Sequence, residues 1–531
     1  MDRTRSKILT VALLAGSLLL AGCEGDDGRN GATGATGPAG AAGAAGAAGA
    51  AGAAGADGAD GADGGGVTVA HDRIIGAAND LRGITYARVG DHANKIYVSG
   101  HVGTTNETRQ VVVGRLFADG TADTSFAGDG YLELEATEEE GGNDENALGI
   151  AELQSGDVIA VTRAVDASGG ESVYLFRVTP DGARAAGWGD AQGKVEVVFG
   201  NANADDGAFP GAPVDAPADL AWDIRVDHSV ETDRVVVFGI GSAGDGIRTD
   251  RDRYVTRLDI TAAGATLDPD FNGGAPFAFG SGGTLAEPGV LTDNARRGMV
   301  EADGSIVSAG YADPAGDIDE HVVLIKLTAD GELDANFGGF TDDETILAAT
   351  PGIAIFNPFI VDEGFAESYA VGKQSSGSYV TIGYGGATRN DGTASTLGYE
   401  TTVRQDVVAF RVVDGPQVSH DLTFGNGGHL VIQSEGHGFP SARARGRHME
   451  VLHDDRILVA GMFGGSAGVF VLTEQGALDS TVAGNGILEL RNDTVTSQFF
   501  GLAQSADGSR VALTTNSNDN GARIVILKIA P

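Results

Sequence analysis

A short β-rich phrase returns seven times along the chain and limits the folds open to it. The phrase is a run of aliphatic residues that ends near a small residue, and its copies start 54 to 78 residues apart. The copies read KIYVSG (95–100), DVIAVT (157–162), RVVVFG (234–239), SIVSAG (305–310), SYVTIG (378–383), RILVAG (456–461) and RVALTT (510–515). Spacings of this kind indicate one structural unit copied along the chain.

Each repeat contains enough strand candidates for a propeller blade. A second phrase follows the first six copies: an apolar run, a turn and a variant of L-D-x-x-F-G, as in LFADGTADTSFAGDG at 116–130. One more strand candidate follows this turn, and another precedes the first phrase. Seven repeats of four short strands, without a long amphipathic helix, predict an all-β, seven-bladed β-propeller over residues 66–531. The segment 64–80 reads like the opening strand of a repeat, so the two ends of the propeller are expected to meet.

The phrases also resemble a named repeat. They are similar to the delta-60 repeat of large bacterial surface proteins, whose pattern is approximately DGKIVVAG…ALARLNADGSLDTSFGTGG. The similarity extends over residues 66–531 and is strongest in the first, fourth and sixth repeats. In the second repeat Trp188 replaces the phenylalanine, and the fifth contains a long loop at 384–405. The resemblance implies a propeller at the bacterial surface and identifies no catalytic residue.

The aspartate-rich turn at 116–130 raises the question of a calcium site. An EF-hand loop needs glycine at its sixth position and glutamate at its twelfth. Counted from Asp119, these positions hold Thr124 and Gly130, so the pattern fails. Two residue types recur in the equivalent turns: Asp123, Asp268, Asp334 and Asp479, with Phe126, Phe271, Phe337 and Phe424. We interpret the aspartate as a turn cap that accepts backbone N–H groups, and the phenylalanine as filling between blades.

This turn is expected to end one blade and lead into the next. Weak calcium binding by its aspartates stays open as the alternative. No other cofactor or metal is expected.

A set of basic residues is not shared by all repeats. They precede the second strand of repeats one, four and six: Arg82, Arg296, Arg297, Arg443, Arg445, Arg447 and His448. Blade ends surround a propeller axis, so these residues could converge on one rim of the channel and bind an anion, such as a carboxylated sugar, a phosphate or an acidic protein loop. The alternative is pairing with nearby carboxylates such as Asp293 and Glu301.

The N-terminus has the pattern of a lipoprotein signal peptide, residues 1–22. Three basic residues precede an apolar run of 15 residues, ILTVALLAGSLLLAG, which is shorter than the roughly 20 residues of a spanning helix. The following LAGC resembles the lipobox of bacterial lipoproteins, which implies that Cys23 is lipidated and anchors the protein in the membrane. Glu24, rather than aspartate, follows the cysteine and favours the outer membrane or cell surface. Cys23 is the single cysteine, so no disulfide is expected.

A glycine-rich tether, residues 23–65, separates the signal from the propeller. From Gly25 to Gly64 glycine occupies every third position, fourteen times in succession, which matches the Gly-X-Y period of collagen. Pro38 is the only proline in this run, so its backbone angles are not preset. Two interpretations stay open: a homotrimer formed through residues 25–66, and a flexible spacer.

Composition and motifs limit the function more than they define it. A formal net charge of −39 repels phosphate backbones, so nucleic-acid binding is not expected. The chain contains no H-E-x-x-H and no cysteine nucleophile in the propeller. We therefore expect a lipid-anchored binding or scaffolding module of the cell envelope. A propeller hydrolase or lyase acting on extracellular polysaccharide, and a structural surface protein without a discrete ligand, are the alternatives.

Overall fold

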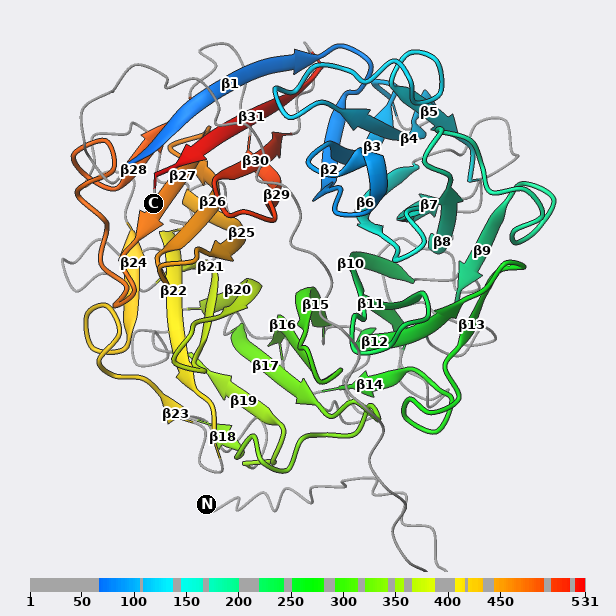
Figure 1. Ribbon diagram of the computed structural model, residues 1–531. Helices are drawn as coiled ribbons and strands as arrows, with labels where there is room; N and C mark the ends of the chain where they lie inside the picture. The colour runs from blue at the N-terminus through cyan, green and yellow to red at the C-terminus, as the bar shows by residue number, and fades with distance from the viewer. Residues whose placement is uncertain are drawn as a thin grey trace, which may run out of the picture. The chain divides into compact units, whose positions relative to one another are not determined.

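The propeller forms a ring of seven four-stranded blades (Figure 1). The computed structural model describes residues 66–105, 108–136, 145–165, 171–199, 219–242, 251–280, 292–313, 320–341, 349–357, 365–386, 406–415, 419–432, 444–490, 498–515 and 521–530. The prediction of an all-β, seven-bladed propeller is confirmed. The signal peptide, the tether and Cys23 lie outside the described residues.

Each of the first six blades is built from strands that follow one another outward from the axis. Blades 1 to 3 consist of β2 (Asp80–Tyr86), β3 (Ile96–Val102), β4 (Gln110–Leu116) and β5 (Tyr131–Leu134); β6 (Asn146–Glu152), β7 (Val158–Val165), β8 (Glu171–Val178) and β9 (Lys194–Val197); and β10 (Leu220–Val226), β11 (Arg234–Ser242), β12 (Arg251–Ile260) and β14 (Phe277–Phe279).

Blades 4 to 6 repeat this order. They consist of β15 (Thr292–Val300), β16 (Ile306–Asp313), β17 (His321–Leu327) and β19 (Ile353–Phe356); β20 (Phe365–Lys373), β21 (Tyr379–Gly386), β22 (Asp406–Val413) and β24 (His429–Ile432); and β25 (Ala444–Val451), β26 (Ile457–Phe463), β27 (Ser466–Leu472) and β28 (Ile487–Glu489). Short elements accompany the blades: η1 (Gly90–His92), β13 (Ala265–Leu267), β18 (Phe340–Thr341) and β23 (Ser419–His420).

The seventh blade joins the two ends of the propeller. Its inner strands are β29 (Phe499–Gln504), β30 (Arg510–Thr515) and β31 (Ala522–Ile529), and its outermost strand is β1 (Val67–Ile75). β1 pairs antiparallel with β31 from Val67 opposite Ile529 to Ile75 opposite Ala522, and the two strands lie side by side in Figure 1. The expectation that the ends of the propeller meet is confirmed.

The boundary between blades differs from the expectation. The turn at 116–130 lies between β4 and β5, which pair with each other, so it connects two strands of one blade. Because β1 completes blade 7, the sequence repeat is offset by one strand from the structural blade. A repeating sequence can be divided at any point in its period, and only the strand pairing shows where a blade begins.

The hydrophobic core is divided among the interfaces between adjacent blades, which we call seams. One cluster joins Tyr97 and Val113 of blade 1 to Ile150 and Phe176 of blade 2, and all four side chains are buried. A large apolar residue of the turn before the outermost strand is buried in each of six seams: Phe126, Trp188, Phe271, Phe337, Phe424 and Val482. Both faces of each sheet therefore carry aliphatic side chains that pack against the neighbouring blades.

Five of these six turns also contain an aspartate with the geometry of an Asx turn; the turn of Trp188 has Ala185 at the equivalent position. Asp123 Oδ1 accepts the backbone N–H of Ser125 at 3.1 Å, while Asp123 Oδ2 lies 2.6 Å from Arg115 Nε. The same backbone bond, from the residue two positions later, is made to Asp268, Asp334, Asp421 and Asp479 at 2.9 to 3.0 Å. Asp421 was not singled out from the sequence, although D-L-T-F has the same spacing as D-T-S-F.

The turns also bind neighbouring blades to one another. An arginine of the third strand donates through Nη1 to a backbone carbonyl in the turn of the following blade; we call these the seam arginines. They are Arg115 to Pro180, Arg177 to Thr261, Arg257 to Ala329 and Arg411 to Glu474. In five seams, the backbone N–H that follows the buried aromatic residue donates to the same turn, as in Ala127 to Asp181 O at 2.9 Å.

Replacing Asp268 by alanine should lower the free energy of unfolding by about 3–5 kcal/mol, because the buried guanidinium of Arg257 loses a carboxylate 2.7 Å away. Urea denaturation followed by tryptophan fluorescence measures the loss. Asp270→Ala, at an exposed position in the same turn, is the matched control and should change stability by less than about 0.5 kcal/mol. The double variant Arg257→Met with Asp268→Leu should cost less than Asp268→Ala alone, since no charge is left unpaired. Equal stability of Asp268→Ala and Asp270→Ala would contradict the role of this pair.

Stability should fall in acid. Burial opposes the charge of Asp123, but hydrogen bonds from Lys95, Ser125 and Arg115 lower its pKa well below the ordinary value. The pKa values of Asp421 and Asp479 are lowered in the same way, by hydrogen bonds that outweigh burial. A carboxyl group whose folded pKa is depressed stabilises the fold above the unfolded pKa, about 3.9, and this contribution is lost as the pH falls. The urea midpoint should therefore be flat from pH 7 to 5 and drop below about pH 4. An unchanged urea midpoint at pH 3 would contradict a stabilising role of the charged turn aspartates.

Candidate binding site at the propeller axis

A β-bulge interrupts the innermost strand of every blade. The pairing with the second strand skips one residue in six blades and two residues in blade 4. The bulged residues are Arg82, Leu148, Trp222, Arg296 with Arg297, Tyr369, Arg447 and Phe500. A bulge redirects its side chain out of the regular alternation of the strand. The residue that follows the bulge is small in five blades; a Cβ at Gly83 would lie 2.9 Å from the backbone of Gly149 in blade 2.

The bulged side chains form a ring in which arginines and aromatic residues alternate. Arg82 lies over Phe500 at 4.6 Å from the ring centroid, Arg447 lies at 5.6 Å from Phe500 and 4.5 Å from Tyr369, and Arg296 lies at 4.7 Å from Tyr369 and 4.1 Å from Trp222. Leu148 of blade 2 fills the remaining place, and Trp222 packs against its cluster. We call these seven residues the axial ring. Each contact has the geometry of a cation–π interaction.

Side chains also span the axis between blades on opposite sides. Arg297 of blade 4 donates through Nη2 to the carbonyl of Phe500 in blade 7 at 2.7 Å, and its Nη1 lies 3.4 Å from Asp223 Oδ1 in blade 3. Arg225 of blade 3 donates to Asp223 at 2.8 Å and to His448 Nε2 of blade 6 at 3.4 Å. Arginine can only donate, so Nε2 of His448 accepts and the imidazole is neutral.

The pKa values agree with this protonation. Burial, Arg297 and Arg225 lower the pKa of His448 well below its ordinary value. Burial also lowers the pKa of Arg297, to about 10, despite the nearby carboxylate of Asp223. The bonds across the axis thus join a charged Asp223–Arg225–Arg297 group to a neutral histidine.

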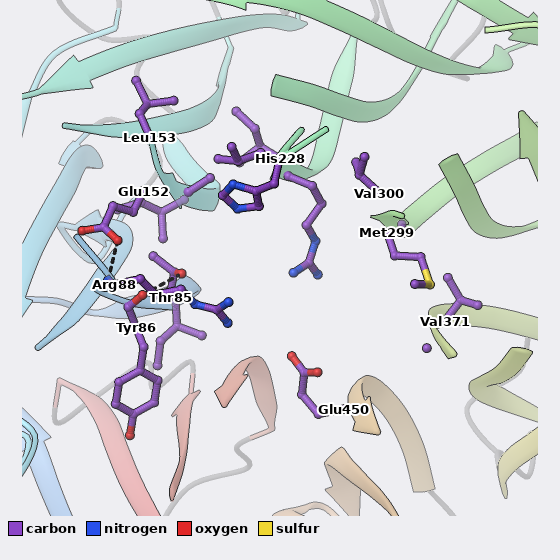
Figure 2. Close-up of a pocket in the computed structure, with 18 of the residues that line it drawn as sticks. Thr85, Tyr86, Arg88, Glu152, Leu153, His228, Met299, Val300, Val371 and Glu450 are labelled. Carbon is purple, nitrogen blue, oxygen red and sulfur yellow. Dashed lines mark hydrogen bonds between the residues drawn. The ribbon is translucent and has the colours of Figure 1, made fainter. Parts of the chain in front are cut away.

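A cavity of about 680 Å³ lies at the ends of the inner strands. Six of the seven blades contribute to its wall, from Ile84–Val89 of blade 1 to Met449–Val451 of blade 6. Figure 2 shows Arg88, Glu152 and His228 on one side of it, and Met299 with Val371 on the other. Arg225 belongs both to this wall and to the bonds across the axis. We call this space the axial cavity.

The charged groups of the axial cavity are held in different ways. Glu152 accepts the backbone N–H groups of Arg88 and Val89 at 2.5 and 3.3 Å, and burial raises its pKa although these bonds act against the rise. Lys373 is paired with Glu301 at 2.7 Å. The side chain of Arg225 is 34% exposed, although its Nε is paired with Asp223. The cavity therefore offers the guanidinium groups of Arg88 and Arg225 to a molecule that enters it.

The structure brings most of the predicted basic residues to the axis. Arg82, Arg297 and Arg447 all contact Phe500, and Arg296 and Arg447 share Tyr369. Arg445 lies over Tyr384 at 4.8 Å. Arg443 lies outside the described residues. Aromatic rings and two carboxylates, Asp80 and Asp223, contact the guanidinium groups at the axis.

Of the two carboxylates named as alternative partners, Glu301 contacts other residues. Glu301 bonds to Lys373 and to Tyr379 Oη, and the field of Asp293 acts on Arg253. The aspartates and phenylalanines of the turns lie in the seams, between the third and the outermost strand of each blade. Within the described residues, no group of three or more His, Cys, Asp or Glu side chains could hold a metal ion. No helix among them has the length and apolar composition to cross a membrane.

Several residues of the site were missed in the sequence. They are the aromatic members of the axial ring (Trp222, Tyr369 and Phe500) and the residues of the cavity (Arg88, Glu152, Arg225, His228 and Glu450). A signal for the ring was present: the variable residue stands just before a small one in DLRG, NALG, ARRG, ESYA and FFG. No comparable signal marks the cavity.

Comparison with known proteins supports the fold and adds no ligand. Residues 94–126 and 301–337 match a family model described as a β-propeller domain of unknown function (DUF5122). Both matches end on a buried aromatic residue of the seams, Phe126 and Phe337. No curated protein matches the chain.

Among solved structures, the chain is similar to the C-terminal WD40 domain of Sif2. The sequence identity is 9%, the TM-score is 0.36, and the match covers 87% of this chain and 100% of the other. A likeness at this level carries no argument about ligand or mechanism.

Tyr369→Leu should destabilise the propeller by about 2–4 kcal/mol, because Arg296 and Arg447 both lose the ring that they contact. Tyr369→Phe keeps the ring and should cost less than about 1 kcal/mol. The free energies come from urea denaturation of the two variants and the wild type. Equal losses in the two variants would show that the hydroxyl, rather than the ring, matters.

Proposed function

We propose that this chain is a lipid-anchored binding protein of the cell envelope, whose axial cavity takes a small ligand with an anionic group. The axial cavity is the observation that carries the proposal. A concave site of several hundred Å³, lined by polar and apolar side chains of several strands, can hold a small molecule. Its position at the axis means that all contributing blades can contact one ligand.

The anionic group is supported by the cations of the cavity. The guanidinium of Arg88 is exposed on the wall, and among the described residues only its backbone N–H is hydrogen-bonded. Arg225 of blade 3 lines the same cavity as Arg88 of blade 1. Two guanidinium groups suit a carboxylate or a phosphate, because each provides parallel N–H donors. Both guanidinium groups face one cavity although the chain as a whole has a net charge of −39.

The rigidity of the site also supports a binding role. Arg225 is fixed by Asp223, which Arg297 and the backbone N–H of Gly298 hold in turn at 3.4 and 3.3 Å. A group whose orientation is set before the ligand arrives loses little entropy when it binds. Cation–π contacts of the axial ring also link side chains from six blades near this site.

The anchor is supported by the N-terminal sequence. The lipobox at 20–23 precedes a tether of Gly-X-Y repeats, which would hold the propeller away from the membrane. Glu24 and the resemblance to surface-protein repeats support display at the outer membrane or cell surface.

A hydrolase is the second candidate because two carboxyl groups with raised pKa, Glu152 and Glu450, line the same cavity. A buried carboxyl group of this kind suits a general acid. Product analysis separates the two functions: shorter oligosaccharides released from an acidic polysaccharide would favour the enzyme.

Arg88→Gln should weaken binding of a small anion about ten- to hundredfold, since one charged hydrogen bond contributes roughly 1.5–3 kcal/mol. Calorimetric titration of the purified protein with glucuronate, cyclohexanecarboxylate, inorganic phosphate and glucose measures the effect. Arg184→Gln, an exposed arginine of blade 2, is the matched control. Higher salt should weaken the binding of the anions but not the binding of glucose. Failure of every anion to bind would contradict the proposed function.

Cys23→Ser should move the protein from the membrane pellet to the soluble fraction, because no acyl chain can be attached to a serine at this position. Fractionation of cells followed by immunoblotting measures the shift. A variant that still sediments with the membrane after a salt wash would contradict the lipid anchor.

A further inference from the structure

Glu450 has an unusual place in the axial cavity. It lies on the inner strand β25, between Met449 and Val451, and its carboxylate points into the cavity in Figure 2. No hydrogen bond to this carboxylate is made by the described residues, whereas Glu152 in the same wall accepts two. A half-buried carboxylate that loses part of its contact with bulk water normally gains hydrogen bonds from the protein in exchange. Here this capacity is left to whatever occupies the cavity.

The surroundings of Glu450 set the chemistry that could use this capacity. Burial raises its pKa, while the positive fields of Arg225 and Arg88 act in the opposite direction. Met299 and Val371 lie on the side of the cavity opposite Arg88 and Glu152, and their side chains suit the apolar part of a ligand (Figure 2). One cavity therefore combines two cations, one free carboxylate and an apolar wall.

We propose that the ligand of the axial cavity is a hydroxylated carboxylate, such as a sugar acid, and that Glu450 selects it by accepting its hydroxyl groups. This inference rests on the proposed function, which supplies the anionic group and its contacts with Arg225 and Arg88. The hydroxyl groups of the ligand then donate to Glu450, and the C–H face of its ring lies on Met299 and Val371.

The free carboxylate discriminates against simpler anions. A carboxylate or phosphate without neighbouring hydroxyl groups meets the negative charge of Glu450 and offers it no hydrogen bond in return. A neutral sugar can donate to Glu450 but leaves the guanidinium groups of Arg225 and Arg88 without an anion. Selectivity of this kind comes from groups left unpaired by the wrong ligand.

The test compares three ligands of similar ring size by calorimetric titration of the full-length protein in detergent. Glucuronate carries the anion and the hydroxyl groups, cyclohexanecarboxylate carries only the anion, and glucose carries only the hydroxyl groups. The wild type should bind glucuronate at least about tenfold more tightly than either of the others, as expected for a charged hydrogen bond. Equal affinities for glucuronate and cyclohexanecarboxylate would overturn the inference and leave the proposed function standing. Binding of neither would overturn the proposed function itself.

Glu450→Met removes the acceptor in a wall that already contains Met299 and Met449. Affinity for glucuronate should fall about tenfold or more. Affinity for cyclohexanecarboxylate should stay the same or rise, because the repelling charge is gone. Glu196→Met, at an exposed position on β9, is the matched control and should change neither affinity.

A parallel loss of both carboxylates in Glu450→Met would indicate a structural role and contradict the inference. Glu450→Gln provides an independent check with the least change in shape. Its amide oxygen still accepts from hydroxyl groups, so the preference for glucuronate should persist while cyclohexanecarboxylate binds more tightly than to the wild type. Weaker binding of cyclohexanecarboxylate to Glu450→Gln would overturn the role assigned to the charge.

Discussion

The propeller depends on a guanidinium buried where two blades meet. A seam arginine such as Arg257 holds the aspartate of its own turn at 2.7 Å and donates to a carbonyl of the next blade. The first contact fixes the turn that places Phe271 in the seam, and the second fixes the next blade against it. Local turn geometry and the packing of neighbouring blades are therefore coupled through one side chain. Because a buried charge is tolerated only when both contacts form, a displaced blade is costly.

The junction between blades 7 and 1 reaches the same result with other atoms. Blade 7 ends at the C-terminal strand β31 and has no turn of the kind found in the other blades. Arg73 of β1 donates to the carbonyl of Asp119 at 2.7 Å, where other seams use a backbone N–H, and Arg510 lies 3.5 Å from the carbonyl of Ala118. Two side chains thus replace the missing backbone contact at the point where the ring closes. The strand pairing of β1 with β31 is then one of several bonds across this junction.

The sequence predicts the parts of this molecule that recur and misses the parts that do not. Copies of the strand phrase and of L-D-x-x-F-G were sufficient for the fold, because each copy forms the same local structure. The blade boundary was wrong, since a period carries no origin. The axial ring was half visible: its arginines stood out, but Trp222, Tyr369 and Phe500 come from different repeats and meet them only through the bulges. Glu450 is one of 74 acidic residues, and only the closed ring shows that it points into a cavity.

The odd number of blades limits how arginines and aromatic residues can alternate in the axial ring. Two kinds of residue can alternate without interruption only around an even number of places, and a seven-bladed ring has an odd number. Three arginines and three aromatic residues occupy six places, and Leu148 occupies the seventh, between Trp222 and Arg82. Blade 2 is therefore the place where the pattern is interrupted, although its strands resemble those of the others. The blades share one fold, but because their number is odd, at least one of them must interrupt the alternation, and here it is blade 2.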